Sequence, residues 1–159
     1  MHRVALETAA LQKRPGRTAS EAQEAATALE DGNFNNGSVY EVIARLRLAE
    51  GSFPSAFDAI GRAKALRPTW IEYMTLEGDV YHAMKSLSAA VTAYRDVVNR
   101  ATPGSAAWIG AKRRLALSLF EAGSLQEALS ESRDLVAHAS GDPVSLQLLE
   151  LINGASQKK

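Results

Sequence analysis

Residues 78–97 read GDVYHAMKSLSAAVTAYRDV, and this stretch decides the fold class. Gly78 and Ala90 are small residues on either side of the short segment around Lys85. A tyrosine stands three residues after Gly78 and four residues after Ala90. The pattern predicts one helix over 70–84 and another over 87–101. Two helices of a hairpin approach closely where they cross, and a small residue on each allows that approach. The stretch therefore predicts a helical hairpin.

The same arrangement recurs along the chain, at spacings of 34, 34 and 38 residues. Two columns of small residues and one column of helix ends keep this phase. The extra four residues fall at 101–105 and amount to about one helical turn, so they leave the buried face unrotated. The columns are Ala22, Ala56, Ala90 and Ala128; Ala10, Ala44, Gly78 and Ala116; and Arg17, Gly51, Lys85 and Gly123.

The rest of the chain also predicts helices joined by short loops. Alanine, the best helix former, accounts for 28 of 159 residues, and the five prolines stand where helices begin or end. No segment alternates with period two for long enough to be a strand. Ser38 is the expected cap of the third helix, Gly51 its left-handed end, and Ser124 with Glu127 a capping box. The expected helices are 2–13, 20–31, 39–50, from Pro54 to before Pro68, 70–84, 87–101, 106–122, 125–138 and 143–153.

Composition excludes several classes of function. Lys and Arg together number 18, as do Asp and Glu, so the chain lacks the positive charge that non-specific nucleic-acid binding needs. There is no cysteine and no apolar run long enough to span a membrane. We expect a soluble cytoplasmic protein, or a periplasmic one if the sequence is a fragment of a secreted chain. The alanine content points to a bacterial source.

The repeat resembles the tetratricopeptide repeat, whose pattern is Trp-x2-Leu-Gly-x2-Tyr, then Ala-x3-Phe, then Pro. Gly78-x2-Tyr81 and Ala90-x3-Tyr94 are the clearest matches, and Ala56-x3-Ile60 followed by Pro68 is the cleanest second half. Departures include Glu77 in place of Leu and Ser132 in place of an aromatic residue. The resemblance implies an all-α, right-handed α-solenoid of stacked antiparallel helix hairpins. It covers a single array over 1–159, with repeats near 3–36, 37–70, 71–104 and 109–142 and a C-terminal helix at 143–153.

Members of that family are usually interaction scaffolds, and the first helices of successive repeats line a concave groove. The resemblance therefore implies a peptide or protein partner, no cofactor and no catalysis. Charges of both signs along the groove favour a mixed-charge ligand, while ordinary solvated helix positions are the alternative interpretation. The Lys and Asn pattern of a carboxylate clamp is missing. The groove candidates are Glu41, Arg45, Leu48, Glu72, Thr75, Asp79, His82, Arg113 and Phe120.

No enzymatic motif is present. The three histidines lack metal-ligand spacing, and no nucleophile elbow or phosphate-binding loop occurs. Residues 112–114, Lys-Arg-Arg, form the one local basic run, and their side chains should fan around a helix as a solvated face. RNA contact is the weaker alternative. Trp70 and Trp108 are expected in the core.

The segment 144–152 is apolar over most of a helical circumference, although a terminal helix should carry a polar outer face. We expect a docking surface made by Val144, Leu148, Leu151 and Ile152. A second copy of the chain or a partner protein would cover it, or the next helix of a longer chain. The leading function is a non-catalytic scaffold within a larger assembly. The alternatives are a small chaperone that shields one client and a regulatory accessory domain of a longer chain.

Overall fold

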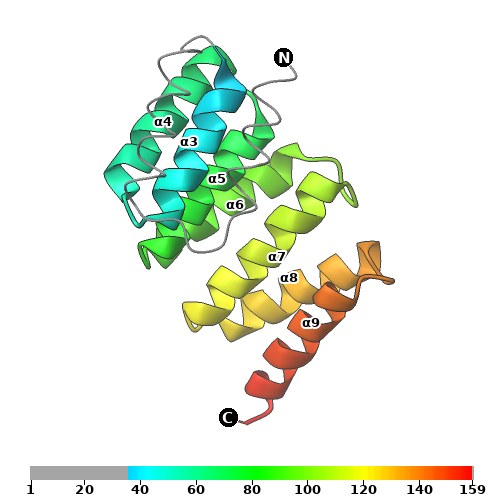
Figure 1. The fold of residues 1–159 in the computed structure, drawn as a ribbon. Helices are drawn as coiled ribbons and strands as arrows, with labels where there is room; N and C mark the ends of the chain where they lie inside the picture. The colour runs from blue at the N-terminus through cyan, green and yellow to red at the C-terminus, as the bar shows by residue number, and fades with distance from the viewer. Residues whose placement is uncertain (1–35, 159) are drawn as a thin grey trace. The chain divides into compact units, whose positions relative to one another are not determined.

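The computed structural model describes residues 36–158, and this part of the chain is entirely helical (Figure 1). The expected helices at 2–13 and 20–31, the repeat 3–36 apart from Asn36, the small residues Ala10 and Ala22 and the expected helix end at Arg17 lie outside the described residues. Seven helices are described: α3 (Gly37–Ala49), α4 (Phe53–Leu66), α5 (Ile71–Ala83), α6 (Leu87–Arg100), α7 (Ala106–Glu121), α8 (Leu125–His138) and α9 (Pro143–Ser156).

Consecutive helices pack as antiparallel hairpins, which confirms the predicted fold class of stacked helical hairpins. The described residues divide into two compact units, with the boundary inside α5 between Leu76 and Glu77. In the first unit α3 packs on α4. In the second, α6 packs on α7, α7 on α8, and α9 on both α8 and α7.

The three hairpin turns share one backbone geometry, which makes the repeat visible in three dimensions. Gly51, Lys85 and Gly123, the predicted column of helix ends, have φ values of 74°, 60° and 82°. The next residue is a serine each time, and its N–H donates to the carbonyl oxygen five residues earlier at 2.8–2.9 Å. This is the Schellman arrangement, in which a left-handed residue ends the helix. Ser52, Ser86 and Ser124 then begin the second helix of each pair.

Lys85 is the one described residue other than glycine in this left-handed conformation. Replacing Lys85 with glycine should raise the free energy of unfolding by about 0.5–1 kcal/mol, because glycine adopts positive φ without steric cost. The Lys85 side chain is 74% exposed, so little packing is lost. Urea unfolding followed by circular dichroism measures the change. A lower stability of Lys85→Gly would show that the backbone strain is outweighed by side-chain contacts.

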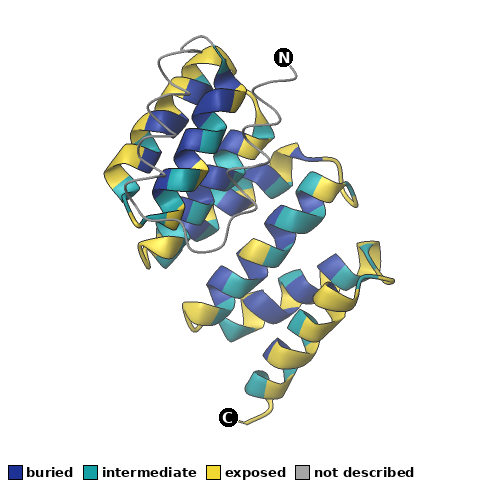
Figure 2. Cartoon of the chain, in the orientation of Figure 1, coloured by how far each residue is buried: buried dark blue, intermediate teal, exposed yellow. Residues whose placement is uncertain are grey.

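The columns of small residues lie where the two helices of each hairpin meet. Ala44 and Ala56, then Ala90, and then Ala116 and Ala128 are fully buried. At Gly78 the contact is so close that a built Cβ would lie 2.5 Å from Cε1 of Tyr94. These findings confirm the packing role that the sequence predicted for the columns. Figure 2 shows the buried residues along the inward-facing sides of the helices.

Two predicted helix caps are wrong. Asn36, not Ser38, caps α3, since its Oδ1 accepts a hydrogen bond from the N–H of Ser38 at 3.0 Å. Ser124 makes no capping bond with its side chain. Its ψ of 63° is set by the hairpin turn, whereas Ser105, which does cap α7, has a ψ of 159°. The final helix also runs three residues beyond the predicted end at 153.

The two tryptophans differ in environment. Trp108 is 3% exposed, as predicted, and its ring lies 4.9 Å from that of His138 between centroids. Trp70 is 43% exposed, so its predicted place in the core is wrong. It stands before the first turn of α5, where the Arg67 guanidinium lies 5.0 Å from its ring centroid. Tyr73 takes the buried position one turn later.

Candidate functional site

In the first unit, three of the predicted groove residues, Glu41, Arg45 and Thr75, make contacts within their own helices. Arg45 Nη2 lies 2.9 Å from Glu41 Oε1, an i,i+4 ion pair on the surface of α3. The Thr75 hydroxyl donates to the carbonyl oxygen of Ile71 at 3.2 Å. Leu48 is half-buried on α3, and Glu72 is exposed in the first turn of α5. An exposed ion pair of this kind contributes little to stability, so both charged groups can be redirected towards a ligand.

In the second unit, Asp79 ties α5 to the two helices that follow. The Tyr94 hydroxyl donates to Asp79 Oδ1 at 2.7 Å, and Arg114 Nε donates to the same oxygen at 2.8 Å. Burial and the neighbouring Asp79 carboxylate raise the pKa of Tyr94. The Asp79 side chain is 21% exposed. It is therefore a structural anchor that keeps a fraction of its surface open.

His82 lies one turn further along α5 and faces a carboxylate that the sequence did not single out. Its Nε2 is a buried atom that lies 3.1 Å from Glu121 Oε2 without forming a hydrogen bond. Lys85 Nζ is 3.6 Å from the same oxygen. The side chains of His82 and Glu121 are 27% and 29% exposed. A carboxylate shared by a histidine and a lysine thus stands at the end of α5.

Arg113 holds the start of α9 against α7. Its guanidinium donates to Asp142 Oδ2 at 2.5 Å and to the Ser145 hydroxyl at 3.2 Å. Asp142 is also the N-cap of α9 and accepts from the N–H of Ser145 at 2.8 Å. Hydrogen bonds from Ser145 and from Arg113 lower the pKa of Asp142. The Asp142 carboxylate therefore stays ionised down to acidic pH, and its contacts with Arg113 and Ser145 persist across the neutral range.

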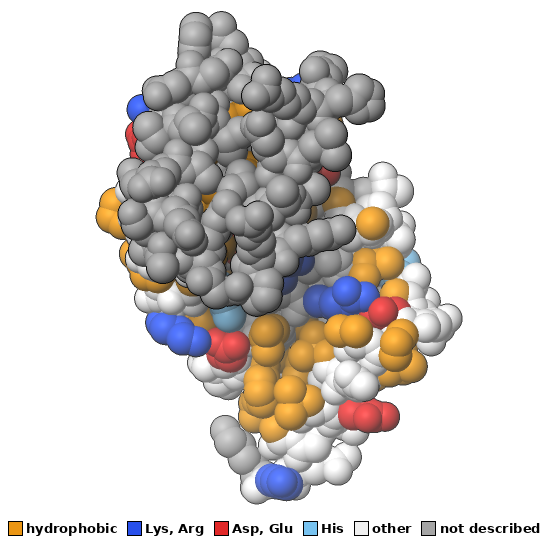
Figure 3. Space-filling view, in the orientation of Figure 1, with side chains coloured by type: hydrophobic (Ala, Val, Ile, Leu, Met, Phe, Trp, Pro, Cys, Tyr) orange, Lys and Arg blue, Asp and Glu red, His pale blue; other side chains and the backbone are white. Residues whose placement is uncertain are grey.

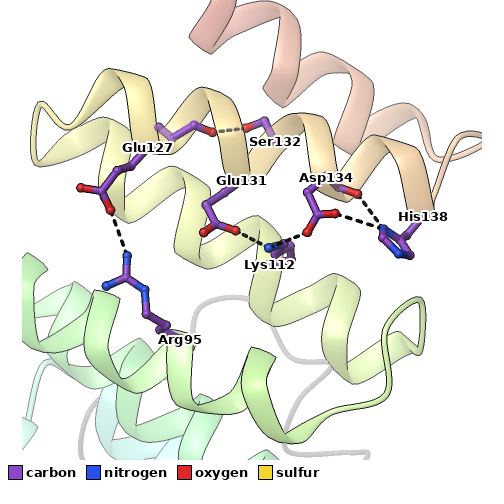
Figure 4. Close-up of polar contacts among 8 residues, drawn as sticks. Arg95, Lys112, Glu127, Glu131, Ser132, Asp134 and His138 are labelled. Carbon is purple, nitrogen blue, oxygen red and sulfur yellow. Dashed lines mark hydrogen bonds and ion pairs between the residues drawn. The ribbon is translucent and has the colours of Figure 1, made fainter.

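The basic run 112–114 is not a solvated face, and that interpretation is wrong. Its side chains do fan around α7 as expected, but each reaches acidic groups beyond α7. Arg114 pairs with Asp79 of α5, and Arg113 pairs with Asp142 at the start of α9. Lys112 is 6% exposed and pairs with Glu131 and Asp134 of α8 (Figure 4). Three consecutive cations therefore tie α7 to α5, α8 and α9.

Lys112 lies in a small aromatic and acidic cluster that the sequence did not reveal. Its Nζ is 2.8 Å from Asp134 Oδ2 and 5.2 Å from the ring centroid of Trp108. The His138 ring lies tilted against Trp108, and its Nδ1 is 3.4 Å from Asp134 Oδ1. The one sequence signal for this cluster was that Lys112 follows Trp108 by four residues, which places the lysine on the same side of the helix as a residue expected in the core.

The predicted docking helix, α9, presents only part of its predicted surface. Val144 and Leu151 are 53% and 54% exposed, and Leu148 is half-buried against the core. Ile152 is fully buried, so its predicted contact with a partner is wrong. Phe120 of α7 is half-buried against the same core cluster as Leu148. Figure 3 shows hydrophobic side chains gathered over α7 and α9, with charged side chains beside them.

A separate hollow of about 360 Å³ lies between α3 and α4 in the first unit. Arg62 stands on its wall with its guanidinium 5.7 Å from the Tyr40 ring centroid, and it pairs with Asp58 at 3.2 Å. The charges on this wall are compensated within the chain. The lining residues are Tyr40, Ile43, Arg47, Pro54, Ser55, Asp58, Ala59 and Arg62.

Among residues 36–158, no group of three His, Cys, Asp or Glu side chains could hold a metal ion. None of the described helices has the length and apolar character that crossing a membrane requires. A comparison of the sequence with models of known protein families and with curated proteins found no match.

Proposed function

We propose that this protein is a non-catalytic interaction scaffold of the tetratricopeptide type, which binds a peptide or helix of a protein partner along its first helices. The observation that carries the proposal is the row of contacts joining α5, α7 and α9. Asp79 meets Arg114, His82 meets Glu121, and Arg113 meets Asp142. The first helices of successive hairpins are thereby held side by side.

These groups suit recognition because contacts with neighbouring helices hold them in place while part of each side chain stays exposed. Their side chains are 21–43% exposed, and each lies against a partner on a neighbouring helix. Binding to groups that are already ordered avoids most of the entropy cost of fixing long side chains. Because acidic and basic groups stand together, the ligand should carry charges of both signs. Phe120 adds an apolar contact beside them.

The pairing also weighs against a catalytic role for the same residues. A general acid or base needs a titratable group that can reach a substrate and that has a pKa matched to its task. Here Arg113 and Asp142 satisfy each other, as do Arg114 and Asp79. A scaffold can bind a ligand through such ion pairs without any change in their protonation. The proposal also keeps the sequence-based expectation of a bacterial, cytoplasmic protein.

A peptide-library selection tests this proposal with a charge-reversal variant and a matched control. Glu121→Arg alters the candidate surface and removes contacts to His82 and Lys85. Glu127→Arg makes the same change of charge on α8 and removes one contact, to Arg95 at 3.0 Å. Peptides enriched by the parent should lose about tenfold or more in affinity for Glu121→Arg, or about 1.4 kcal/mol, and bind Glu127→Arg normally.

Circular dichroism first establishes that both variants keep the helicity of the parent. Enriched peptides that bind both variants equally would move the binding surface away from α5 and α7. A selection that enriches no peptide, together with solubilisation of an unfolded client, would favour the chaperone alternative. In that case a short linear motif is not what the protein recognises.

A further inference from the structure

We propose that the exposed stripe of α9 binds the same stripe of a second copy, with the two α9 helices antiparallel. Among residues 36–158, six large hydrophobic side chains are exposed, and three of them belong to this one helix. Two of these three, Val144 and Leu151, share one side of α9. Leu148 and Ala155, both half-buried, complete that side.

The spacing of the stripe is that of a helix-pairing seam. Residues 144, 148, 151 and 155 follow one another at intervals of four, three and four, which keeps them within one narrow sector of the helix. The buried side of α9, which includes Ser145 and Ile152, is turned towards α8 and the core. The seam is therefore open to solvent at Val144 and Leu151 and partly covered at Leu148 and Ala155.

The charge pattern favours a second copy over an unrelated charged partner. Glu150 is the only charged residue within α9, and it lies off the seam, so a partner chosen by charge has no group to recognise there. Gln147 and Gly154 are exposed beside the seam, and neither carries a charge. The same apolar seam on a second copy fits, because it brings no charged group that would need a partner there.

The ends of the helix select the antiparallel direction. Asp142 caps the start of α9, and the exposed Lys158 follows its end. Antiparallel packing brings Lys158 of one copy near Asp142 of the other and opposes the two helix dipoles favourably. Parallel packing would place the two lysines together. In the antiparallel register Val144 faces Ala155 of the second copy, and Leu148 faces Leu151, so leucine pairs fill the centre of the seam and a valine–alanine pair closes each end.

The inference is independent of the proposed binding of a ligand by α5 and α7, and sedimentation equilibrium tests it. A single pair of helices is a small interface, so we expect a weak dimer within the range of about 10 µM to 1 mM. Leu151→Glu should weaken self-association about tenfold or more, because two-fold symmetry places two unpaired carboxylates in the seam. Leu146→Glu is the matched control, because Leu146 is 39% exposed on the opposite flank of α9.

Cross-linking tests the direction and does not depend on the glutamate variants. The chain has no cysteine, so single cysteines report cleanly. Mixing Val144→Cys with Ala155→Cys should give mainly the mixed disulfide. In the antiparallel pair two copies of residue 144 stand about 16 Å apart along the axis, beyond disulfide reach. A monomer at every concentration, equal effects of Leu151→Glu and Leu146→Glu, or mainly like-with-like disulfides would each overturn the proposal.

Discussion

Replacing Gly78 with alanine is expected to lower the free energy of unfolding by about 2 kcal/mol, although alanine is the better helix former. The new methyl group would lie 2.5 Å from Cε1 and 2.8 Å from Cδ1 of Tyr94. That ring is 2% exposed, and its hydroxyl is held by Asp79. Because the ring has no free space to move into, the α5–α6 hairpin must open. Urea unfolding followed by circular dichroism measures the loss.

Gly61→Ala is the matched control, since Gly61 lies inside α4 and a built Cβ there has no neighbour within 4 Å. Helix propensity alone should then raise stability by about 0.5–1 kcal/mol. Opposite signs for the same substitution would isolate the effect of the close helix contact. A Gly78→Ala protein as stable as the parent would show that Tyr94 can shift, and the small-residue column would lose its packing explanation.

Truncating Lys112 to alanine should lower the free energy of unfolding by about 2–3 kcal/mol, somewhat less than the roughly 3–5 kcal/mol of a fully buried broken ion pair. The side chain is 8% exposed, and its removal leaves Glu131 and Asp134 facing one another without a cation. It also removes the aliphatic chain packed near Trp108. Both carboxylates keep some exposure to water, so the loss should stay moderate.

The control for Lys112→Ala is Arg95→Ala, which also removes a cation that pairs with a glutamate of α8. Arg95 and Glu127 are 46% and 62% exposed, so that loss should stay below about 0.5 kcal/mol. Burial lowers the pKa of Lys112, but the hydrogen bonds to Asp134 and Glu131 outweigh it, and the net pKa is raised. The contribution of Lys112 is therefore fully present at neutral pH and is lost only as pH rises through that raised pKa. Equal losses for the two variants would show that burial of Lys112 adds nothing.

The helices were largely predictable because their signals are local. Gly51 and Gly123 end helices where the sequence placed them, and Lys85 has the same conformation although its side chain disfavours it. The repeat spacing predicted the helix end at Lys85, and all three turns close with the same hydrogen bonds. Caps were less predictable. Whether a serine caps depends on its ψ angle, and that angle is set by the turn before it.

The polar surface was only partly predictable. The sequence placed Asp79, His82 and Arg113 on one side of the first helices, but it gave no indication of their partners. Arg114 and Glu121 of α7 are the partners of Asp79 and His82, and Asp142 at the start of α9 is the partner of Arg113. The sequence pattern of a charged residue on the exposed side of a helix is the same whether the side chain is solvated or forms an ion pair. The basic run 112–114 is the clearest case, since each of its three cations is paired with an acidic group beyond α7.

By itself the sequence determined the all-helical class, the hairpin phase and the small residues at the helix crossings. These depend on backbone propensity and on spacings within one or two helices. Tertiary structure decided which residues are free to bind. Ile152 is buried while Leu151 is exposed, and Trp108 is buried while Trp70 is not. When apolar residues surround a helix, the sequence does not distinguish its buried side from its exposed side. The positions of the neighbouring helices determine which of these residues are covered.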